Sequence, residues 1–196
     1  FKMKIVNVVC APGRTGFFFD DQKAIKCGAV SDGAAYVGET MTPGFKSIRQ
    51  AGESISVMLI LEDGQVAWGD CAAVQYSGAG GRDPLFLAED FIPVIDKYIK
   101  PALVGKEADN FRELTKMMEA IEVDGKRLHT AIRYGVSQAI LDAVAKSSKR
   151  LMSEVVADEY GTTVSEEPIA IFTQSGDNRY ENADKMILKG AAILPH

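Results

Sequence analysis

The hydrophobic pattern of this 196-residue chain changes period twice, and the order of the patterns restricts the folds open to it. Residues 54–61 and 65–71 read as strands on either side of a turn that contains Asp63-Gly64, which predicts a β-hairpin. Apolar residues then recur at helical spacing, and a strand, a loop, a helix and a second strand follow from Pro168. That last order is typical of a βαβ unit in a parallel sheet. We therefore predict an α+β fold that leads into a parallel α/β fold.

The remaining elements are predicted from local signals. A first strand is expected at 4–9, and the stretch between Gly13 and Gly52 predicts irregular loops with one further strand, at 17–19 or 36–40. Asp83-Pro84 has the order of a helix start, and that helix should reach toward Pro101 with a kink or split at Pro93. The other expected elements are helices from Asp109 or Asn110 to about 121, at 129–146, at 151–160 and at 181–190, and strands at 169–172 and 193–194.

The last segment is an isolated βαβ unit, and one such unit cannot bury its own sheet face. We therefore expect more strands to belong to this sheet and the chain to be cut inside a structural element at His196.

Composition excludes several classes of protein. The 22 basic and 27 acidic side chains give a formal charge of −5 without a basic cluster, which argues against a nucleic-acid or anionic-membrane partner. The longest apolar run near the middle, 57–61, is far shorter than the roughly 20 residues that a membrane span needs. Three cysteines without a CxxC pair fit neither a disulfide framework nor a zinc site, so we expect a reduced, cytoplasmic protein.

Two polar residues follow the strands of the predicted parallel sheet. Gln174 lies after the first strand and His196 after the second, and the carboxyl ends of parallel strands are where α/β proteins carry their active sites. The alternatives are a loop-capping amide for Gln174 and a solvated end residue for His196.

Gln75 comes just before Gly78-Ala79-Gly80-Gly81, which lacks the remaining residues of a phosphate-binding loop. We interpret this glycine-rich segment as a flexible loop that is able to act as a lid, with Gln75 on it; a surface glutamine at a strand end is the alternative.

Other conspicuous residues are interpreted as structural. His129 is expected to be an ordinary residue of a helix N-terminal turn or of an interface. The residues of 17–19 are expected to pack in the core, and aromatic contact with a substrate is the alternative. The pairs Asp20-Asp21 and Glu166-Glu167 are expected to be solvated loop charges, since adjacent side chains point apart.

Several segments closely resemble the methylaspartate ammonia-lyase family of the enolase superfamily, and the resemblance runs from Met3 through essentially the whole chain. It is carried by 54–57, 62–67, 127–135, 138–145, Gln174-Ser175-Gly176-Asp177 and above all the specific segment 69–88. The resemblance implies an α+β capping domain at 1–167, formed by an antiparallel sheet and helices. It further implies the first strand, helix and second strand of a (β/α) TIM-type barrel at 168–196.

The resemblance also implies a reaction, the reversible α,β-elimination of ammonia from threo-3-methylaspartate to give mesaconate in glutamate fermentation. It implies magnesium, a monovalent cation such as potassium as activator, a small amino-acid substrate and a homodimer. By the same resemblance, Gln75, Gln174 and His196 contact the substrate, and His196 can act as acid or base. The metal ligands and the base lysine of the family belong to strands that would follow His196.

Two alternatives remain. One is a non-catalytic α+β binding module that ends at His196, and the other is an enolase-superfamily acid–base enzyme with a different substrate. For the isolated 196-residue chain we expect neither elimination activity nor a specific magnesium site.

Overall fold

The computed structural model describes residues 2–176 and 178–193. The chain forms two compact units, Phe1–Thr163 and Val164–His196, and each is described by itself. The division falls shortly before Pro168, where the sequence predicts the change from one kind of fold to the next. Within the described residues, no helix is long and apolar enough to cross a membrane.

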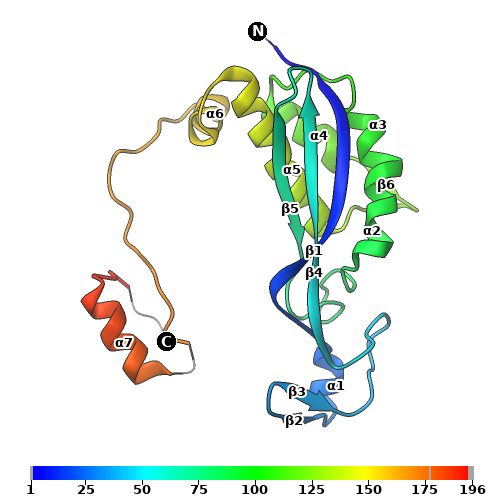
Figure 1. Cartoon of the computed structure of the whole chain (residues 1–196), viewed down its shortest axis with the longest axis vertical. Helices are drawn as coiled ribbons and strands as arrows, with labels where there is room; N and C mark the ends of the chain where they lie inside the picture. Colours follow the sequence, from blue (N-terminus) through cyan, green and yellow to red (C-terminus); the bar gives the residue numbers. More distant parts are fainter. Residues whose placement is uncertain (1, 177, 194–196) are drawn as a thin grey trace. The chain divides into compact units, whose positions relative to one another are not determined.

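The first unit is built on a three-stranded antiparallel sheet in the order β1-β4-β5 (Figure 1). β4 (Arg49–Leu61) and β5 (Val66–Ala72) form the hairpin predicted from Asp63-Gly64. Gly64 has a φ of 87°, a backbone conformation that glycine adopts without strain. The hairpin prediction is confirmed.

β1 (Ile5–Asp20) is much longer than the strand expected at 4–9, so the prediction of irregular loops directly after Gly13 is wrong. It stays paired with β4 as far as Asp20↔Arg49 and has a register shift between Arg14 and Phe18. Because β1 is an edge strand, Pro12 costs the sheet no essential ladder hydrogen bond, and the apparent breakers are tolerated.

Residues 21–48, which connect β1 to β4, form a small tip at one end of the sheet (Figure 1). The tip contains α1 (Gln22–Lys26) and the antiparallel pair β2 (Val30–Asp32) and β3 (Ala35–Val37).

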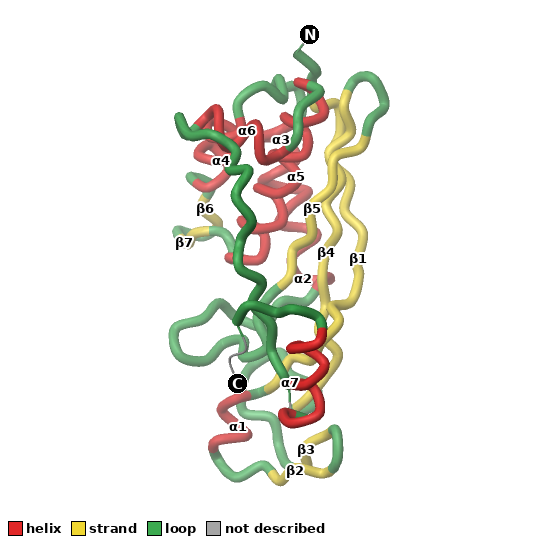
Figure 2. The backbone as a smooth tube through the Cα atoms, turned by 90° about the vertical axis from the view of Figure 1, so that its left-hand side faces the viewer, coloured by secondary structure: helices red, strands yellow, loops and turns green. Residues whose placement is uncertain are grey.

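In the first unit, helices cover one face of the sheet (Figure 2). α4 (Phe111–Glu119), α5 (Thr130–Ser148) and α6 (Met152–Glu159) form where the sequence predicts them. The short pair β6 (Glu122–Val123) and β7 (Lys126–Arg127) connects α4 to α5.

The predicted helix toward Pro101 forms in three consecutive parts, which are α2 (Ala88–Val94), the π-helical turn η1 (Ile95–Ile99) and α3 (Lys100–Leu103). The change in helix type follows Pro93, whose missing N–H removes one bond of the helical ladder, so the predicted split is confirmed. The helix starts later than Asp83-Pro84 predicts, because the Ala88 N–H is capped at 2.8 Å by Glu53 from β4.

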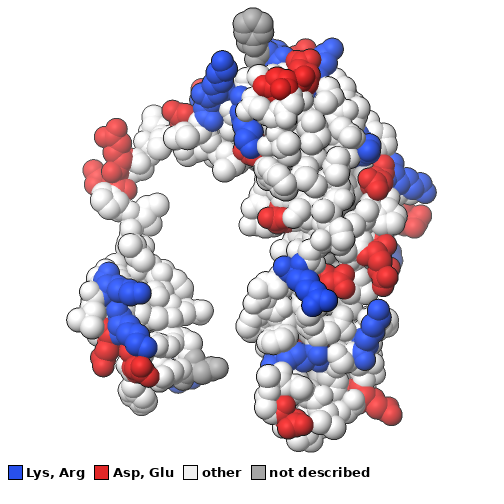
Figure 3. Space-filling model, in the orientation of Figure 1, with Lys and Arg blue, Asp and Glu red and all other residues white. Residues whose placement is uncertain are grey.

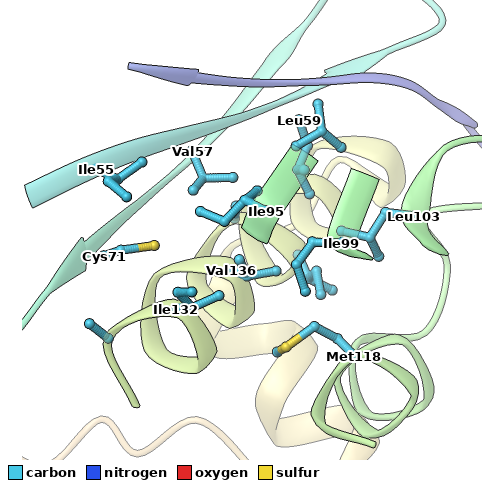
Figure 4. Close-up of a cluster of buried hydrophobic side chains, with 14 of the residues drawn as sticks. Ile55, Val57, Leu59, Cys71, Ile95, Ile99, Leu103, Met118, Ile132 and Val136 are labelled. Carbon is cyan, nitrogen blue, oxygen red and sulfur yellow. The ribbon is translucent and has the colours of Figure 1, made fainter. Parts of the chain in front are cut away.

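The core of the first unit lies between the sheet and these helices (Figure 4). Alternate residues of β4 point into it, and the helices meet them with aliphatic side chains and Met118. The residues labelled in Figure 4 are Ile55, Val57, Leu59, Cys71, Ile95, Ile99, Leu103, Met118, Ile132 and Val136.

β5 and α5 approach each other through glycine. A Cβ at Gly69 would overlap the Gly135 carbonyl oxygen and lie 2.7 Å from the Ala139 nitrogen. A Cβ at Gly135 would lie 2.6 Å from Cys71 Sγ. The helix therefore packs with its backbone almost directly on the strand, at a distance that only glycine permits.

The second unit contains α7 (Arg179–Leu188) and a short parallel contact between Phe172 and Ile193. Ile193 donates its N–H to Ile171 O at 3.1 Å, and Thr173 donates to Ile193 O at 3.1 Å. The predicted helix therefore forms, whereas among the described residues the strands predicted at 169–172 and 193–194 are reduced to this single parallel bridge. α7 has no buried residue.

Candidate functional site

Gln75 is the predicted site residue whose surroundings are best defined. It lies just after β5, at the start of the glycine-rich segment 73–82, and is half-buried. Its side-chain Nε2 donates to Asp20 Oδ2 at 2.6 Å, and its backbone carbonyl accepts the Asp20 N–H at 2.9 Å. One residue of β1 thus holds both the backbone and the side chain of Gln75.

Asp20 forms a buried ion pair with Arg49. Asp20 is only 1% exposed. One oxygen of its carboxylate accepts a hydrogen bond from Arg49 Nε at 2.7 Å, and the other accepts one from Arg49 Nη2 at 2.8 Å. Burial by itself would raise the pKa of Asp20, but hydrogen bonds from Arg49 and Gln75 and the Arg49 charge outweigh it and lower the pKa below its usual value. The side chain is therefore an anion with three donors around it.

The expectation that Asp20 and Asp21 are solvated loop charges is wrong. Both are buried, because β1 runs on to Asp20 and the tip folds over Asp21. Asp21 accepts hydrogen bonds from the backbone of Ala24, Met41 and Thr42 and from the Thr42 hydroxyl. Its side chain fixes the tip, and its hydrogen bonds to the described residues do not include Gln75. Glu166 and Glu167 are exposed, as predicted.

Arg49 lies between two aromatic rings. Its guanidinium carbon is 5.0 Å from the Phe18 ring centre and 4.9 Å from the Tyr36 ring centre. These contacts add cation–π attraction to the ion pair and tie β3 to the sheet. Of the three phenylalanines expected in the core, only Phe19 is buried; Phe17 and Phe18 are exposed, so that prediction is partly wrong.

The glycine-rich segment folds as a series of tight turns. Gly78, Gly80 and Gly81 have φ values of 68°, 61° and 78°, which favour glycine, and Gly78 donates its N–H to Asp83 O at 2.7 Å. A cavity of about 270 Å³ lies beside this segment and reaches the start of α5. The glycine-rich segment and the start of α5 therefore both line this cavity.

His129 caps α5 and is structural, as predicted. Its Nδ1 accepts the Ala131 N–H at 3.0 Å, which leaves Nε2 to donate to Pro84 O at 3.0 Å. Both Phe86 and Phe91 pack on its ring. Burial lowers the pKa of His129 below its usual value, and the partners Pro84 and Asp83 oppose that change only in part.

Asp83 has a different role from the one the sequence predicts. It does not cap the helix after Pro84; its carboxylate accepts the Thr130 N–H at 2.7 Å and pairs with Arg127 at 3.1 Å. Asp83 therefore caps α5, a helix distant in sequence, and joins it to the end of the glycine-rich segment.

The other two predicted site residues belong to the second unit. Gln174 is exposed and lies after the bridge residue Phe172, near the end of the predicted strand. His196 lies outside the described residues. Within residues 2–176 and 178–193, no group of three His, Cys, Asp or Glu side chains is arranged to hold a metal ion. The described residues do not fit a magnesium site, and no chemical step through a metal follows from them.

Sequence reasoning missed Asp20 and Arg49 as partners of Gln75. They are far apart in the chain and become neighbours only through the β1–β4 register. The one local signal was a carboxylate directly after an apolar aromatic run. Such a carboxylate is found at the end of a strand as well as in a loop, so the signal did not distinguish the two.

The fold is shared with solved structures that are distant in sequence. A muconate cycloisomerase from Pseudomonas fluorescens matches 99% of this chain and 43% of its own length with a TM-score of 0.55 at 16% identity, which shows the fold alone. This likeness and the antiparallel sheet with its helical layer define the class of fold as α+β.

Closer comparisons give the family. Residues 3–161 match the family described as "Methylaspartate ammonia-lyase N-terminus" and residues 163–196 match "Methylaspartate ammonia-lyase C-terminus". The chain belongs to the methylaspartate ammonia-lyase family.

Individual relatives agree over nearly the whole chain. Methylaspartate ammonia-lyase of Clostridium tetanomorphum is 63% identical over 194 residues, which are 99% of this chain and 47% of that protein. The Mg-complex structure of beta-methylaspartase from the same organism, also 63% identical, has a TM-score of 0.94 over 99% of this chain and 47% of its own. The Citrobacter amalonaticus enzyme, solved containing (2S,3S)-3-methylaspartic acid, has a TM-score of 0.94 at 57% identity with the same coverage. The chain spans about half the length of these relatives.

Proposed function

We propose that this chain is the capping half, with the first part of the barrel, of an enzyme that eliminates ammonia from threo-3-methylaspartate to give mesaconate, reversibly. The observation that carries the proposal is the match of the N-terminal and C-terminal family descriptions to consecutive parts of one chain. The relative solved with (2S,3S)-3-methylaspartic acid, at 57% identity, supports this substrate class.

The proposed site residues suit that reaction chemically. The substrate carries two carboxylates and an ammonium group, and a neutral amide is able to bind either kind of group without adding charge. Gln75 in the first unit and Gln174 in the second are proposed to bind the substrate. His196 is proposed to contact a substrate carboxylate and to serve as acid or base, since an imidazole titrates near neutral pH.

The proposed enzyme requires groups that the described residues do not supply. Magnesium is supported by the relative whose structure is a Mg complex. When bound, it would stabilise the negative charge that develops as a proton leaves the carbon beside a carboxylate. A monovalent cation such as potassium, a homodimer and a cytoplasmic location complete the proposal, the last in keeping with the free cysteines Cys10, Cys27 and Cys71.

The test joins this chain at His196 to the remaining part of the Clostridium tetanomorphum relative. We expect this joined protein to form mesaconate from threo-3-methylaspartate with added magnesium and potassium, measured by the ultraviolet absorbance of the conjugated product. The isolated 196-residue chain, assayed in parallel, should form none.

The control is the joined protein with His196→Asn, which should keep the fold and lose most of the activity. A joined protein that folds, as judged by circular dichroism, but forms no mesaconate would contradict the proposed function. An isolated chain with full activity would contradict the assignment of this chain as one half of the enzyme.

A further inference from the structure

We propose that Asp20 and Arg49 are positioning residues that fix the orientation of the Gln75 side-chain amide, so that its carbonyl oxygen is the atom presented to the ligand. The three residues are called the Gln75 clamp. The proposal rests on the proposed function for its effect on catalysis, whereas the clamp geometry stands on contacts within the first unit alone.

The orientation follows from the chemistry of a carboxylate. An amide has two donors on nitrogen and an acceptor oxygen, and a half-turn of the group exchanges them. Asp20 is ionised and accepts only, so Gln75 Nε2, at 2.6 Å from Asp20 Oδ2, must face it. Among the described residues, this side chain hydrogen-bonds through Nε2 only, which leaves Oε1 as the free acceptor.

Arg49 makes the clamp rigid. A buried carboxylate without a partner would take up a proton, and a protonated Asp20 would offer Gln75 a donor as well as an acceptor. The two parallel bonds from Arg49, at 2.7 and 2.8 Å, keep the carboxylate charged and fix its plane. The rings of Phe18 and Tyr36 hold the guanidinium in turn.

The backbone contact sets the position of the amide as well as its orientation. Asp20 donates its N–H to Gln75 O at 2.9 Å, so the glycine-rich segment is held to the end of β1 at this residue. The three glycines with positive φ lie further along the segment. Gln75 is therefore fixed at the start of the loop, before its glycine turns.

The test uses the joined protein with Asp20→Asn, Gln75→Ala and both changes together. Asparagine keeps the size of the side chain but supplies a donor and an acceptor, so it no longer selects one orientation of the Gln75 amide. We expect Asp20→Asn to lower kcat/KM for threo-3-methylaspartate by about 10- to 100-fold. In the Gln75→Ala background, the same change should lower it by no more than about twofold, since effects transmitted through one side chain do not add.

The matched control is Asp21→Asn, which removes a neighbouring buried carboxylate that binds the tip and not Gln75. Its effect on kcat/KM should be the same with and without Gln75→Ala. If Asp20→Asn does not fold, Arg49→Lys replaces it, because lysine keeps the charge and loses the two-pronged bond. Equal effects of the Asp20 or Arg49 change in both backgrounds would overturn the clamp.

A second measurement separates failure of the clamp from failure of the proposed function. In the unliganded joined protein, hydrogen–deuterium exchange of 73–82 should be faster with Asp20→Asn and unchanged with Asp21→Asn. If the joined protein is inactive, the proposed function fails, and if Gln75→Ala has full activity, the role of Gln75 in that function fails. In both cases the hydrogen–deuterium exchange result alone decides whether the clamp exists. Unchanged exchange with Asp20→Asn overturns the clamp in either case.

Discussion

His129 shows how a residue that is typical of catalytic sites is used for structure. Its Nδ1 accepts the Ala131 N–H, and the neutral tautomer then donates to Pro84 O. Protonation would place a hydrogen on Nδ1 and remove the cap of α5. The lowered pKa of His129 is consistent with this arrangement, because the buried ring is held in its neutral form.

The pH dependence of unfolding tests this assignment. In the unfolded chain a histidine titrates near pH 6.5, whereas folded His129 has a lower pKa, so the unfolded state binds the extra proton first as pH falls. The contribution of His129 is therefore complete above about pH 6.5 and is lost as pH falls toward the folded-state pKa.

The comparison variant is His129→Asn, which keeps a capping side chain and does not titrate. At about pH 7 it should be less stable by roughly 1–2 kcal/mol, because the packing on Phe86 and Phe91 is lost. Its free energy of unfolding, from urea denaturation, should fall less steeply than that of the natural chain between about pH 7 and about pH 5. Equal slopes would contradict a buried neutral His129.

Asp20 shows where residue patterns stop being informative. The aromatic run before it and the acid after it are visible in the sequence, yet its partners Arg49 and Gln75 come from distant segments. Nothing local indicates that a strand interrupted by Pro12 and two glycines continues to this residue. Gln75 itself was predicted from a family resemblance, and its surroundings could not be predicted from the sequence.

At the scale of elements, helices with complete local signals were predicted well. α4 has the capping residue Asn110, whose side chain accepts the Glu113 N–H at 2.9 Å, and α5 has a long apolar repeat. The start of α2 was missed, because Glu53 from a distant strand provides the cap. Local sequence patterns thus predict the bounds of helices that are capped by neighbouring residues. The bounds of helices such as α2 depend on tertiary contacts and could not be predicted in this way.

The contact between β5 and α5 gives a prediction at this scale. Gly135→Ala places a Cβ 2.6 Å from both Cys71 Sγ and the Asp70 carbonyl carbon, and closer still to the Cys71 backbone nitrogen, and backbone atoms cannot move aside independently. We expect the free energy of unfolding to fall by at least about 2 kcal/mol, measured by urea denaturation.

The matched variant is Gly16→Ala on β1, where nothing lies within 4 Å of the added methyl group. Its stability should stay within about 0.5 kcal/mol of the natural chain. If the two variants were equally stable, α5 would not pack on β5 through its backbone.

At the scale of the whole molecule, the two units differ in how much they bury. The first has a continuous core between a sheet and its helices, whereas α7 in the second buries none of its residues, with Tyr180 91% and Leu188 87% exposed. The charged side chains on the view of Figure 3 are scattered over both units and form no single basic surface. This agrees with the absence of a basic cluster in the sequence.

The first unit should be stable without the second. A chain shortened to end at Thr163 should unfold cooperatively in urea, with a free energy within about 0.5 kcal/mol of the whole chain, because the first unit has its own continuous core and α7 of the second buries none of its residues. Limited proteolysis of the whole chain should cut within 161–172, where every residue is exposed, and release the same fragment. A shortened chain that fails to fold would show that the core depends on the second unit.

The pairing of Asp20 with Arg49 has a consequence for protein engineering. The tip begins directly after Asp20 and ends directly before Arg49. The pairing of β1 with β4 is therefore complete without any residue of the tip. The tip is thus a cassette, in the sense that another loop of suitable length is able to replace it without changing the strand register. A graft would need to keep an apolar anchor at Phe45, which belongs to the main core. It would also need to keep an aromatic ring at Tyr36, which covers Arg49.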